Sequence, residues 1–575
     1  MRPVHPALSL RLPIGRARVL LWLLLAGFVV LVGRALYLQV LDSEFLQHEG
    51  AMRYARSLEL SAHRGRITDR NGELLAISTP VESVFASPQD VRMSAAQRRQ
   101  LAALLGMSDA QLRQRLAAKT RGFVYLKRHL PPDVAARVVQ LRLSGIGLRR
   151  EYKRYYPAGA VASHLIGFTD IDDHGQEGIE LAYEDWLAGK PGSRSVIKDR
   201  LGRVIEAGEN VRPPLEGRDL VLSIDSKLQY LAYRELKAAV KEHGAKAGAI
   251  VVLDSRTGEV LALANAPDYD PNARALRTPD RTRNRAITDL FEPGSTLKPF
   301  TVAAALEARL VRPESRIQTA PGYLVVGDRR IRDVHPAGML TVSEVIQRSS
   351  NVGVAKIALS MSGEQLWQLL NKVGFGAAPQ VGFPGEVGGR LRDFQRWRPI
   401  EQATLSYGHG ISVSLLQLAR AYTVFSGEGT LQPLSLLRRE APGKGTPVMS
   451  PGTANAVRTM LEAVVQPGGT AVRAQVMGYR VAGKTGTARK LDGGRYAHDR
   501  HVSSFVGLAP VSDPRLIVAV MIDEPTKGHY YGGVVAAPVF SAVISEALRT
   551  MHVAPDAPTM VLEPVDSATQ VKEEV

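Results

Sequence analysis

The sequence contains no cysteine among its 575 residues. Disulfide bonds and thiolate metal sites are therefore excluded, and the absence is compatible with an oxidising compartment. Zinc-finger spacings, glycine-rich phosphate loops and basic repeats interleaved with aromatic residues are also missing, although the formal net charge is +17. No nucleic-acid partner is therefore expected, and the positive charge suits an anionic membrane surface or an anionic polymer substrate instead.

Acidic residues are absent before Asp42, and residues 1–18 form a basic leader. An uncharged run follows over residues 19–33, and the apolar character continues to Val40 if Arg34 is tolerated. The run is short for a membrane span, long enough for a cleaved signal peptide, and also open to reading as a buried core helix. Arg34 can snorkel to the interface, and no small-residue cleavage site follows. We therefore expect one transmembrane anchor over residues 19–40 in the inner membrane, with the positive flank in the cytoplasm.

The segment after the anchor shows structural patterns but little chemistry. Asn71-Gly72 predicts a hairpin turn within His63–Ala76, and Val91–Leu143 is rich in helical patterns. Asp170–Gly175 lacks the carboxylates that a calcium loop needs at its later positions, so we expect a solvated acidic loop. Pro213-Pro214 marks the boundary between this segment and the domain that follows.

One stretch of this segment looks like a catalytic signature. Asp42–Gly50 is similar to part of the signature of peptidoglycan glycosyltransferases, but Leu41 stands where that family has its catalytic glutamate. Because no general base is present at that position, we interpret the match as a coincidence.

From Leu220 the pattern changes to apolar strands and helices. Strands at both ends with helices between them predict an α+β domain, in which a mostly antiparallel sheet joins the two ends. The predicted helices cover about Lys227–Glu242 and Val535–Met551, and the predicted strands cover Ala247–Asp254, Glu259–Ala264, Tyr479–Lys490, His501–Ala509 and Arg515–Asp523.

Ser295 and Lys298 form the first chemical motif. Pro293-Gly294 ends the preceding segment, and a helix is predicted over Leu297–Arg309. Positions three apart share a helix face, so the amine of Lys298 should reach the Ser295 hydroxyl. A lysine in a dry site has a lowered pKa and can take the proton of a serine nucleophile. A serine N-cap followed by a surface lysine is the alternative, so further motifs must decide.

Two further motifs lie later in the same predicted domain. Ser349 and Asn351 put a hydroxyl and a carboxamide two residues apart, and Lys484-Thr485-Gly486 follows on a predicted strand. Lys484 and Thr485 offer a cation and a hydroxyl to a carboxylate. A glycine within a strand permits close backbone approach, so Gly486 suggests that an extended ligand lies along this strand.

These three motifs in this order resemble those of penicillin-binding proteins and serine β-lactamases. The second motif is Ser-Ser-Asn instead of Ser-Asp-Asn, which argues against a class A β-lactamase. The stretches Phe291–Thr296, Tyr407–Gly410, Lys484–Arg489 and Arg64–Ala76 are similar to class B penicillin-binding proteins, specifically the division-specific FtsI type. The resemblance covers most of the chain.

The resemblance implies a membrane-anchored D,D-transpeptidase that cross-links peptidoglycan stem peptides during septation and is acylated by β-lactams. It implies an α+β transpeptidase fold with an antiparallel sheet flanked by helices, an N-terminal mixed pedestal domain in the periplasm, and partners such as the FtsW glycosyltransferase. The expected layout is a leader over 1–18, an anchor over 19–40, a pedestal over 41–214, a transpeptidase domain over 215–552 and a loose tail over 553–575.

The resemblance also assigns roles to residues. Ser295 is the nucleophile, Lys298 its base, and the backbone N–H groups of Ser295 and Thr487 stabilise the oxyanion. Ser349, linked to Lys298 and Lys484, passes the proton to the leaving D-alanine. The implied catalytic residues also include Asn351, which orients the donor backbone, and Lys484, which binds the terminal carboxylate with Thr485. The implied substrate-binding residues are Thr485, Gly486, Tyr407 and His409.

Other functions with the same motifs stay open at this point. They are an elongation-specific class B transpeptidase, a D,D-carboxypeptidase, a β-lactamase, and a β-lactam-binding sensor. We expect no cofactor and no metal, because the spacing His498-x-x-His501 is more often a pair of solvated histidines than a ligand pair.

Overall fold

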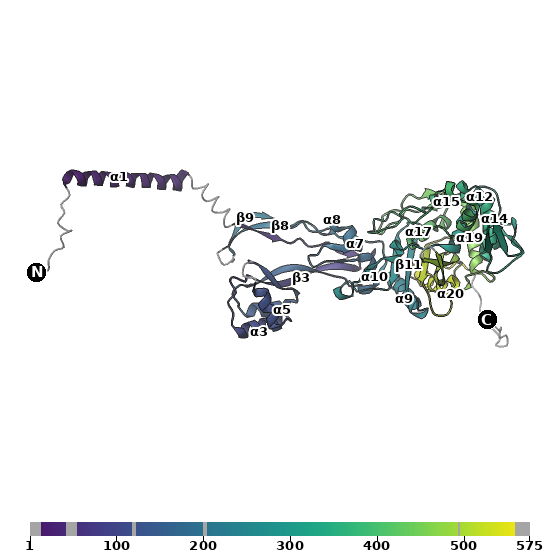
Figure 1. Ribbon diagram of the computed structural model, residues 1–575, viewed down its shortest axis with the longest axis horizontal. Coiled ribbons are helices and arrows are strands. Elements are labelled where there is room, and N and C mark those ends of the chain that lie inside the picture. Colours follow the sequence, from purple (N-terminus) through teal and green to yellow (C-terminus); the bar gives the residue numbers. More distant parts are fainter. Residues whose placement is uncertain (1–12, 42–54, 118–121, 199–203, 493–494, 558–575) are drawn as a thin grey trace. The chain divides into compact units, whose positions relative to one another are not determined.

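The computed structural model describes residues 13–41, 55–117, 122–198, 204–492 and 495–557. The chain forms two compact units (Figure 1). The first unit takes residues up to 62 together with 81–151 and 190–216, and the second takes 63–80, 152–189 and 217 onward. Residues 1–12 of the predicted leader, the stretch Asp42–Gly50, and residues 558–575 of the predicted tail lie outside the described residues.

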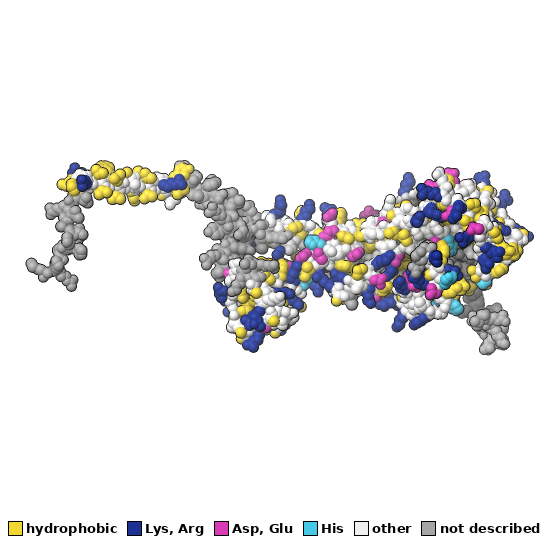
Figure 2. Space-filling view, viewed as in Figure 1, with side chains coloured by type: hydrophobic (Ala, Val, Ile, Leu, Met, Phe, Trp, Pro, Cys, Tyr) yellow, Lys and Arg dark blue, Asp and Glu magenta, His cyan; other side chains and the backbone are white. Residues whose placement is uncertain are grey.

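The chain's first described element is the helix α1 (Ile14–Leu36), which continues into a π-helical turn, η2 (Tyr37–Leu41). No residue of α1 is buried, and its surface is largely hydrophobic in Figure 2. Over Ile14–Gln39 it is long and apolar enough to cross a membrane. It begins before the predicted start at residue 19 because arginine is a good helix former, so the basic flank joins the helix. The other helical stretch of that kind, Gly532–Thr550, is 56% buried and belongs to the core of the second unit.

The first unit contains a small helical lobe around one hydrophobic cluster. Its core includes Leu101, Leu112, Leu126 and Val138. Ser94 and Ser108 begin two of the helices as N-caps within capping boxes. The elements are α3 (Ala95–Leu104), α4 (Asp109–Leu116), β4 (Val124–Leu130), α5 (Pro132–Gln140) and the part of β5 (Ile146–Tyr155) up to residue 151. The predicted helix-rich segment is therefore interrupted by a strand, β4, which pairs with the end of β3 (Leu74–Ala86). Three further strands form an antiparallel sheet: β1 (Ala55–Leu60), β8 (Gly192–Lys198) and β9 (Val204–Arg212).

The predicted acidic loop, Asp170–Gly175, is not fully solvated. The carboxylate of Asp173 accepts a hydrogen bond from Ser78 at 3.1 Å, and Arg64 donates to the Asp173 carbonyl at 3.0 Å. Arg64 is itself buried and pairs with Glu180 at 2.7 Å. Burial raises the pKa of Asp173 to about 6. The prediction was wrong for this residue because its partners are far away in the sequence.

A five-stranded antiparallel sheet forms the core of the second unit. The strand order is β12-β11-β21-β20-β19, so strands from the two ends of the domain pair in its centre, as predicted. All residues of β11 and β12 are buried, which requires cover on both faces. The strands are β11 (Ala247–Asp254), β12 (Val260–Ala266), β19 (Ala482–Asp492), β20 (Arg495–Ala509) and β21 (Leu516–Asp523).

Two separate pairs of helices contact this sheet. One pair is α9 (Ser226–Glu242) with α21 (Ala537–Thr550), and the other is α11 (Arg285–Thr288) with α17 (Leu415–Ala421). The predicted closing helix, Val535–Met551, corresponds to α21, which begins at Ala537 with a proline in its first turn, and the short helix α20 (Gly532–Val535) precedes it. The α+β prediction, an antiparallel sheet flanked by helices, is confirmed.

A helical region between β12 and β19 carries the first two chemical motifs, and the third lies on β19 itself. It contains η5 (Gly294–Leu297), α12 (Lys298–Glu307), α13 (Val342–Gln347), α14 (Asn351–Leu359), α15 (Gly363–Lys372), α16 (Pro399–Leu405), α18 (Thr423–Ser426) and α19 (Pro451–Val465). The short strands of the second unit are β2 (Ile67–Thr68), β6 (Phe168–Thr169), β7 (Gly175–Glu177), β10 (Leu220–Val221), β13 (Arg316–Gln318), β14 (Tyr323–Val326), β15 (Arg329–Arg332), β16 (Met339–Thr341), β17 (Thr430–Leu431) and β18 (Thr446–Pro447). Its short helices are α6 (Ser163–Ile166), α7 (Gly178–Ala182), α8 (Glu184–Leu187) and α10 (Pro279–Thr282).

Candidate active site

Ser295 lies in the 3₁₀ turn η5, immediately before α12. The predicted helix therefore begins at Lys298 instead of Leu297, with Pro299 in its first turn as expected. Residues three apart eclipse each other in a 3₁₀ turn, so Ser295 and Lys298 still share one side. Ser295 is half-buried and lines a cavity of about 780 Å³, and its hydroxyl has no hydrogen-bond partner among the described residues.

The amine of Lys298 is fully buried and is held by Ser349. Its Nζ donates to the Ser349 Oγ at 3.0 Å and to the Ser349 carbonyl oxygen. No hydrogen bond joins it to Ser295 among the described residues, so the expected direct contact is not made in this state. Burial lowers the pKa of Lys298 well below its ordinary value, and the charge of Lys484 lowers it further, while Asp333 opposes the shift.

Lys484 approaches the same hydroxyl from the sheet. It lies on β19, is fully buried, and donates to the Ser349 Oγ at 3.0 Å and to the Thr485 Oγ1 at 3.3 Å. Burial lowers its pKa from 10.5 to about 7. The Ser349 hydroxyl thus bridges two amines, and two ammonium groups so close together in a dry site would repel strongly. One of the two amines is therefore expected to be neutral near pH 7.

The backbone of Ser349 turns its carbonyl toward the amine. Its φ of 60° lies in the left-handed region, which side-chain-bearing residues rarely adopt. Ser350 then caps α14 by accepting from the Gly353 N–H at 2.9 Å, and its hydroxyl donates to Asp333 at 2.7 Å. Asn351 begins α14 and lines the cavity, with its amide held by the Arg332 carbonyl at 3.0 Å.

The turn that bears Ser295 packs on the backbone of β19. A Cβ on Gly294 would lie 3.4 Å from the Thr487 carbonyl oxygen, and one on Gly486 would lie 2.8 Å from the Pro293 carbonyl oxygen and 2.4 Å from the Ser504 hydroxyl. Gly486 itself is not among the residues that line the cavity. The packing of the turn that bears Ser295 against β19 therefore explains why position 486 is a glycine. The predicted approach of a ligand is not needed to explain it.

Thr485 and Thr487 line the cavity from β19. Thr485 shares a hydrogen bond of 2.9 Å with Thr470, which sequence reasoning missed although it follows the glycine pair Gly468-Gly469. The Thr487 hydroxyl accepts from the Gly532 N–H at 3.1 Å. The backbone N–H of Ser295 donates to no acceptor among the described residues, so it is available as an oxyanion donor.

Tyr407 and His409, the two residues that the resemblance assigned to substrate binding, line the cavity. His409 contacts Glu292 at 2.9 Å through Nδ1, and Glu292 also accepts from the Gly410 N–H at 2.8 Å and from the Tyr496 hydroxyl at 3.1 Å. Burial raises the pKa of Tyr407 to about 12, so its hydroxyl stays protonated. The sequence analysis did not identify Glu292, because its hydrogen-bond partners come from distant segments. Its hydrogen bonds connect these segments to the turn that bears Ser295.

Comparisons with known proteins agree with this geometry. The model of the penicillin-binding protein transpeptidase domain matches residues 248–545, just over half of the chain, and the model of the penicillin-binding protein dimerisation domain matches residues 59–222. The chain belongs to the penicillin-binding protein family. The predicted resemblance is thereby confirmed.

Relatives of this penicillin-binding protein match it along almost its whole length. A probable peptidoglycan D,D-transpeptidase, PenA, of Neisseria gonorrhoeae is 44% identical over 548 residues, which cover 95% of this chain and 94% of the relative. The peptidoglycan D,D-transpeptidase FtsI of Escherichia coli K12 is 44% identical over 543 residues, with 93% and 92% covered. The apo structure of the TP domain from Burkholderia pseudomallei penicillin-binding protein 3 is 50% identical, with a TM-score of 0.55, and covers 59% of this chain and 98% of that chain.

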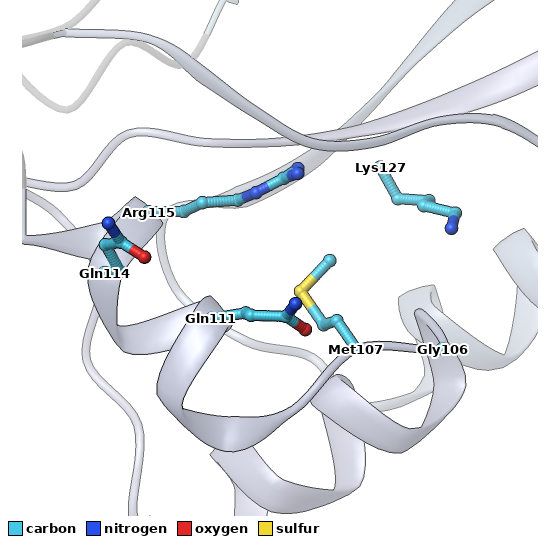
Figure 3. Close-up of a pocket in the computed structure, with 6 residues that line it drawn as sticks. All are labelled: Gly106, Met107, Gln111, Gln114, Arg115 and Lys127. Carbon is cyan, nitrogen blue, oxygen red and sulfur yellow. The ribbon is translucent and has the colours of Figure 1, made fainter.

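The first unit of this penicillin-binding protein contains a smaller pocket of about 360 Å³ (Figure 3). It is lined by Gly106, Met107, Gln111, Gln114, Arg115 and Lys127. Its lining contains no hydroxyl, carboxylate or imidazole, and the guanidinium of Arg115 donates to the carbonyl oxygens of Tyr125 and Leu126. This pocket therefore has no catalytic constellation.

The histidine pair is not arranged as predicted. His501 is buried and stacks on Tyr530 with ring centroids 4.1 Å apart, so the expectation of a solvated side chain was wrong for it. Burial lowers its pKa, which favours the neutral ring. Among the described residues, no group of three or more histidine, aspartate and glutamate side chains is placed to hold a metal ion.

The lowered lysine pKa values predict how acylation depends on pH. Because the pKa of Lys484 is lower in the folded protein than in the unfolded chain, the unfolded chain binds more protons between about pH 7 and pH 10.5, and stability rises with pH there. Protonation of Lys298, whose pKa is also lowered by burial and by the charge of Lys484, removes the base as the pH falls. Acylation by benzylpenicillin should therefore fall roughly tenfold per pH unit on the acid side. Rates measured from about pH 5.5 to about pH 9 check this, and a flat profile would contradict it.

Replacement of Ser349 by glycine and by alanine should distinguish the effect of its backbone conformation on stability from the effect of its hydroxyl on acylation. Both variants lack the Oγ between the amines, so both should lose about 10²-fold in acylation rate. Glycine accepts a φ of 60° without a steric cost, so Ser349→Gly should be more stable than Ser349→Ala by about 1 kcal/mol in urea unfolding. Normal acylation in both variants would exclude the hydroxyl from the proton path.

Proposed function

We propose that this penicillin-binding protein is a peptidoglycan D,D-transpeptidase that cross-links stem peptides through an acyl-enzyme on Ser295. The observation that carries the proposal is the convergence of three distant motifs on one cavity. Ser295 lines it with a free hydroxyl, and the amines of Lys298 and Lys484 meet at Ser349 beside it. The names of its relatives support the same activity.

In the acylation step, the Ser295 Oγ attacks the carbonyl carbon of the D-Ala-D-Ala bond. Neutral Lys298 takes the hydroxyl proton, because burial keeps its pKa low enough for the free amine to exist near neutral pH. The oxyanion is stabilised by the N–H groups of Ser295 and Thr487. The C–N bond then breaks, and the proton passes from Lys298 through the Ser349 hydroxyl to the leaving D-alanine.

The donor peptide is held at both ends of the cavity. Lys484 and Thr485, with Thr470 beside them, bind its terminal carboxylate through one cation and two hydroxyls. Asn351 orients its backbone, and the donor lies along β19 past Gly486. Tyr407 and His409 contact it from the rim. β-Lactams carry the same carbonyl and carboxylate pair, so they acylate Ser295 as donor mimics.

An amine of a second stem peptide completes the reaction by attacking the ester. Lys298 accepts the amine proton, the ester C–O bond breaks, and Ser295 regains its hydrogen. Among the residues lining the cavity, Asp333 is the only carboxylate, and its oxygens accept from Ser350 at 2.7 Å and from the Val352 N–H at 2.9 Å. No free carboxylate is therefore ready to activate water, which favours transpeptidation over the activity of a β-lactamase.

Location and partners complete the proposal. The helix α1 anchors the protein in the inner membrane, its basic flank stays in the cytoplasm, and the catalytic unit acts in the periplasm. Residues 41–214 act as the pedestal and 215–552 as the transpeptidase domain. The similarity to FtsI supports work at the septum beside partners such as FtsW. A fluorescent fusion should gather at midcell, and sidewall localisation would favour the elongation-specific type.

Mass spectrometry after exposure to benzylpenicillin tests the chemistry. The adduct should map to the peptide that contains Ser295 and should persist for far longer than the acylation time. With a D-Ala-D-Ala thioester donor and an added amine, the aminolysis product should exceed the hydrolysis product. Fast loss of the adduct would identify a β-lactamase, and hydrolysis without aminolysis would identify a carboxypeptidase.

A further inference from the structure

The helical lobe of the first unit carries a concentration of positive charge. Its residues, 81–151, include 13 lysines and arginines and five aspartates and glutamates, a net charge of +8 out of the +17 of the whole chain. Almost half of the excess charge therefore lies in about one eighth of the sequence. Figure 2 shows several of these basic side chains on the visible face of the lobe. The proposed transpeptidase reaction takes place in the second unit and does not use them.

The acidic residues of the lobe cannot neutralise this excess, because four of the five already pair with arginines within it. The ion pairs are Asp109–Arg98 at 2.6 Å, Glu151–Arg128 at 3.0 Å, Glu82–Arg150 at 3.6 Å and Asp133–Arg137 at 3.9 Å. Basic residues of the lobe without a carboxylate at ion-pair distance, counting only the described residues, are Arg92, Arg99, Arg115, Lys127 and Arg142. The lobe therefore offers free positive charge to a partner outside it.

Two of these free cations line the pocket of about 360 Å³ in the lobe (Figure 3). Arg115 comes from α4, and its Nη1 donates to the carbonyl oxygens of Tyr125 and Leu126. These bonds fix the guanidinium, while its Nε and Nη2 have no partner among the described residues. Lys127 comes from β4 and is exposed, and its amine has no hydrogen bond or ion pair in the described part of the chain. The pocket is thus lined by N–H donors that await an acceptor.

The rest of the lining indicates the kind of anion that fits. The side chains of Gln111 and Gln114 add two carboxamides, Met107 adds an apolar contact, and no carboxylate opposes an anion. A fixed guanidinium and a lysine amine together suit phosphate oxygens. Carboxamides suit hydroxyl groups next to the phosphate, since they both donate and accept. The pocket therefore fits a phosphate that carries a small polar alcohol.

The place of the lobe in the chain favours a membrane as the source of that phosphate. The apolar helix and its π-helical turn end at Leu41, and β1 of the same unit begins at Ala55. The 13 residues between them can extend over at most about 45 Å, so the unit is tethered near the bilayer surface. A tethered surface meets its partner at a high effective concentration, so a few ionic contacts suffice. Phe123 and Val139, which are 42% and 57% exposed, add apolar side chains suited to the membrane interface.

We propose that the lobe docks on anionic phospholipids of the membrane that holds α1, and that Arg115 and Lys127 bind a headgroup phosphate in this pocket. The inference goes beyond the proposed transpeptidase reaction and rests only on the proposed anchor. Docking gives the first unit a second attachment to the bilayer, and its strength depends on the anionic lipid content and on the salt concentration.

Single-molecule fluorescence transfer in lipid nanodiscs tests the docking. Because the chain has no cysteine, Ala110→Cys gives a single site for a donor dye, at an exposed position of α4 outside the pocket lining. The full-length protein is placed in nanodiscs of phosphatidylcholine alone, or of equal parts of phosphatidylcholine and phosphatidylglycerol. Both kinds of nanodisc carry an acceptor dye on lipid headgroups. The measured quantity is the ratio of high-transfer to low-transfer molecules.

Lys127→Gln and Lys127→Glu probe the pocket without disturbing the fold, because the lysine amine has no partner among the described residues. Arg115 stays unchanged, since its hydrogen bonds support β4. Lys372→Glu is the control for net charge, because Lys372 is an exposed lysine of α15 in the second unit. All variants should be acylated by benzylpenicillin at the wild-type rate, which confirms that the catalytic unit is intact.

Phosphatidylglycerol should raise the transfer ratio of the wild type at least about tenfold. In the mixed nanodiscs, Lys127→Gln should lower the ratio about fivefold and Lys127→Glu about twentyfold or more, while Lys372→Glu leaves it unchanged. A ratio that is the same in both kinds of nanodisc overturns the docking, and a lipid effect that persists in Lys127→Glu overturns the pocket.

Two further outcomes would assign the result elsewhere. If a soluble anionic glycan changes the ratio through Lys127 and phosphatidylglycerol does not, the pocket serves a polymer and the lipid assignment is overturned. Failure of the wild-type protein to enter nanodiscs would overturn the anchor, and the docking with it, while leaving the proposed transpeptidase reaction untouched.

Discussion

Ser295→Ala is expected to abolish covalent labelling by fluorescent penicillin, with a fall of at least about 10⁴-fold in acylation rate. No other hydroxyl has the same position, because the Ser349 Oγ already accepts hydrogen bonds from two amines and Thr487 is engaged by Gly532. Labelling is measured on gels and by intact-protein mass spectrometry. The fold should be unaffected, since the Ser295 hydroxyl has no hydrogen-bond partner among the described residues.

The matched control is Ser360→Ala. Ser360 is an exposed serine at the end of α14, and among the described residues its hydroxyl bonds only the Ile357 carbonyl, at 2.7 Å. This variant should label like the wild type. Undiminished labelling of Ser295→Ala would remove Ser295 from the mechanism.

Lys298→Met is expected to lower acylation by about 10³-fold or more while leaving the melting temperature unchanged or higher. Within the described part of the chain, the fully buried amine has no carboxylate at hydrogen-bond distance, and burial disfavours its charged form. A methionine of similar length fills the same space without this desolvation cost. The opposite directions of activity and stability distinguish a buried catalytic base from a structural lysine.

Acylation kinetics and thermal unfolding on the same preparation check this prediction. If Lys298 were structural, the variant would lose stability and retain acylation in the folded fraction. Lys372→Met is a suitable control, because Lys372 is an exposed lysine in the last turn of α15 and is not among the residues lining the cavity. It should change neither quantity.

Much of the site could be predicted from local sequence. Ser295 and Lys298 stand in a motif that was placed at the start of a helix, and Lys484 stands in one that was placed on a strand. Ser349 and Asn351 were recognised by their spacing of two residues. The strand β11 was predicted with the residue bounds that the structure has, because its apolar run ends sharply at Asp254. The antiparallel sheet joining both ends of the domain followed from the order of such runs.

Other parts of the site depend on contacts between distant segments. The Thr470–Thr485 hydrogen bond, the burial of His501 under Tyr530 and the network around Glu292 have no local signature. The same holds for Asp173, whose acidic neighbours in the sequence suggested solvent while its partners in the fold are Ser78 and Arg64.

The sequence by itself determined the apolar N-terminal helix, the α+β class, the three motifs and the family, because hydrophobic period, turn residues and motif spacing are local properties. The resemblance implied that Ser349 links the two lysines, but only the tertiary structure decided that Lys298 contacts Ser349 and not Ser295 among the described residues. Both amines meet at Ser349, and Gly486 is small because the nucleophile turn packs on it. The physical reason is that a pKa, a close approach or a shared hydrogen bond depends on what surrounds a side chain in space, and residues far apart in the chain supply those surroundings.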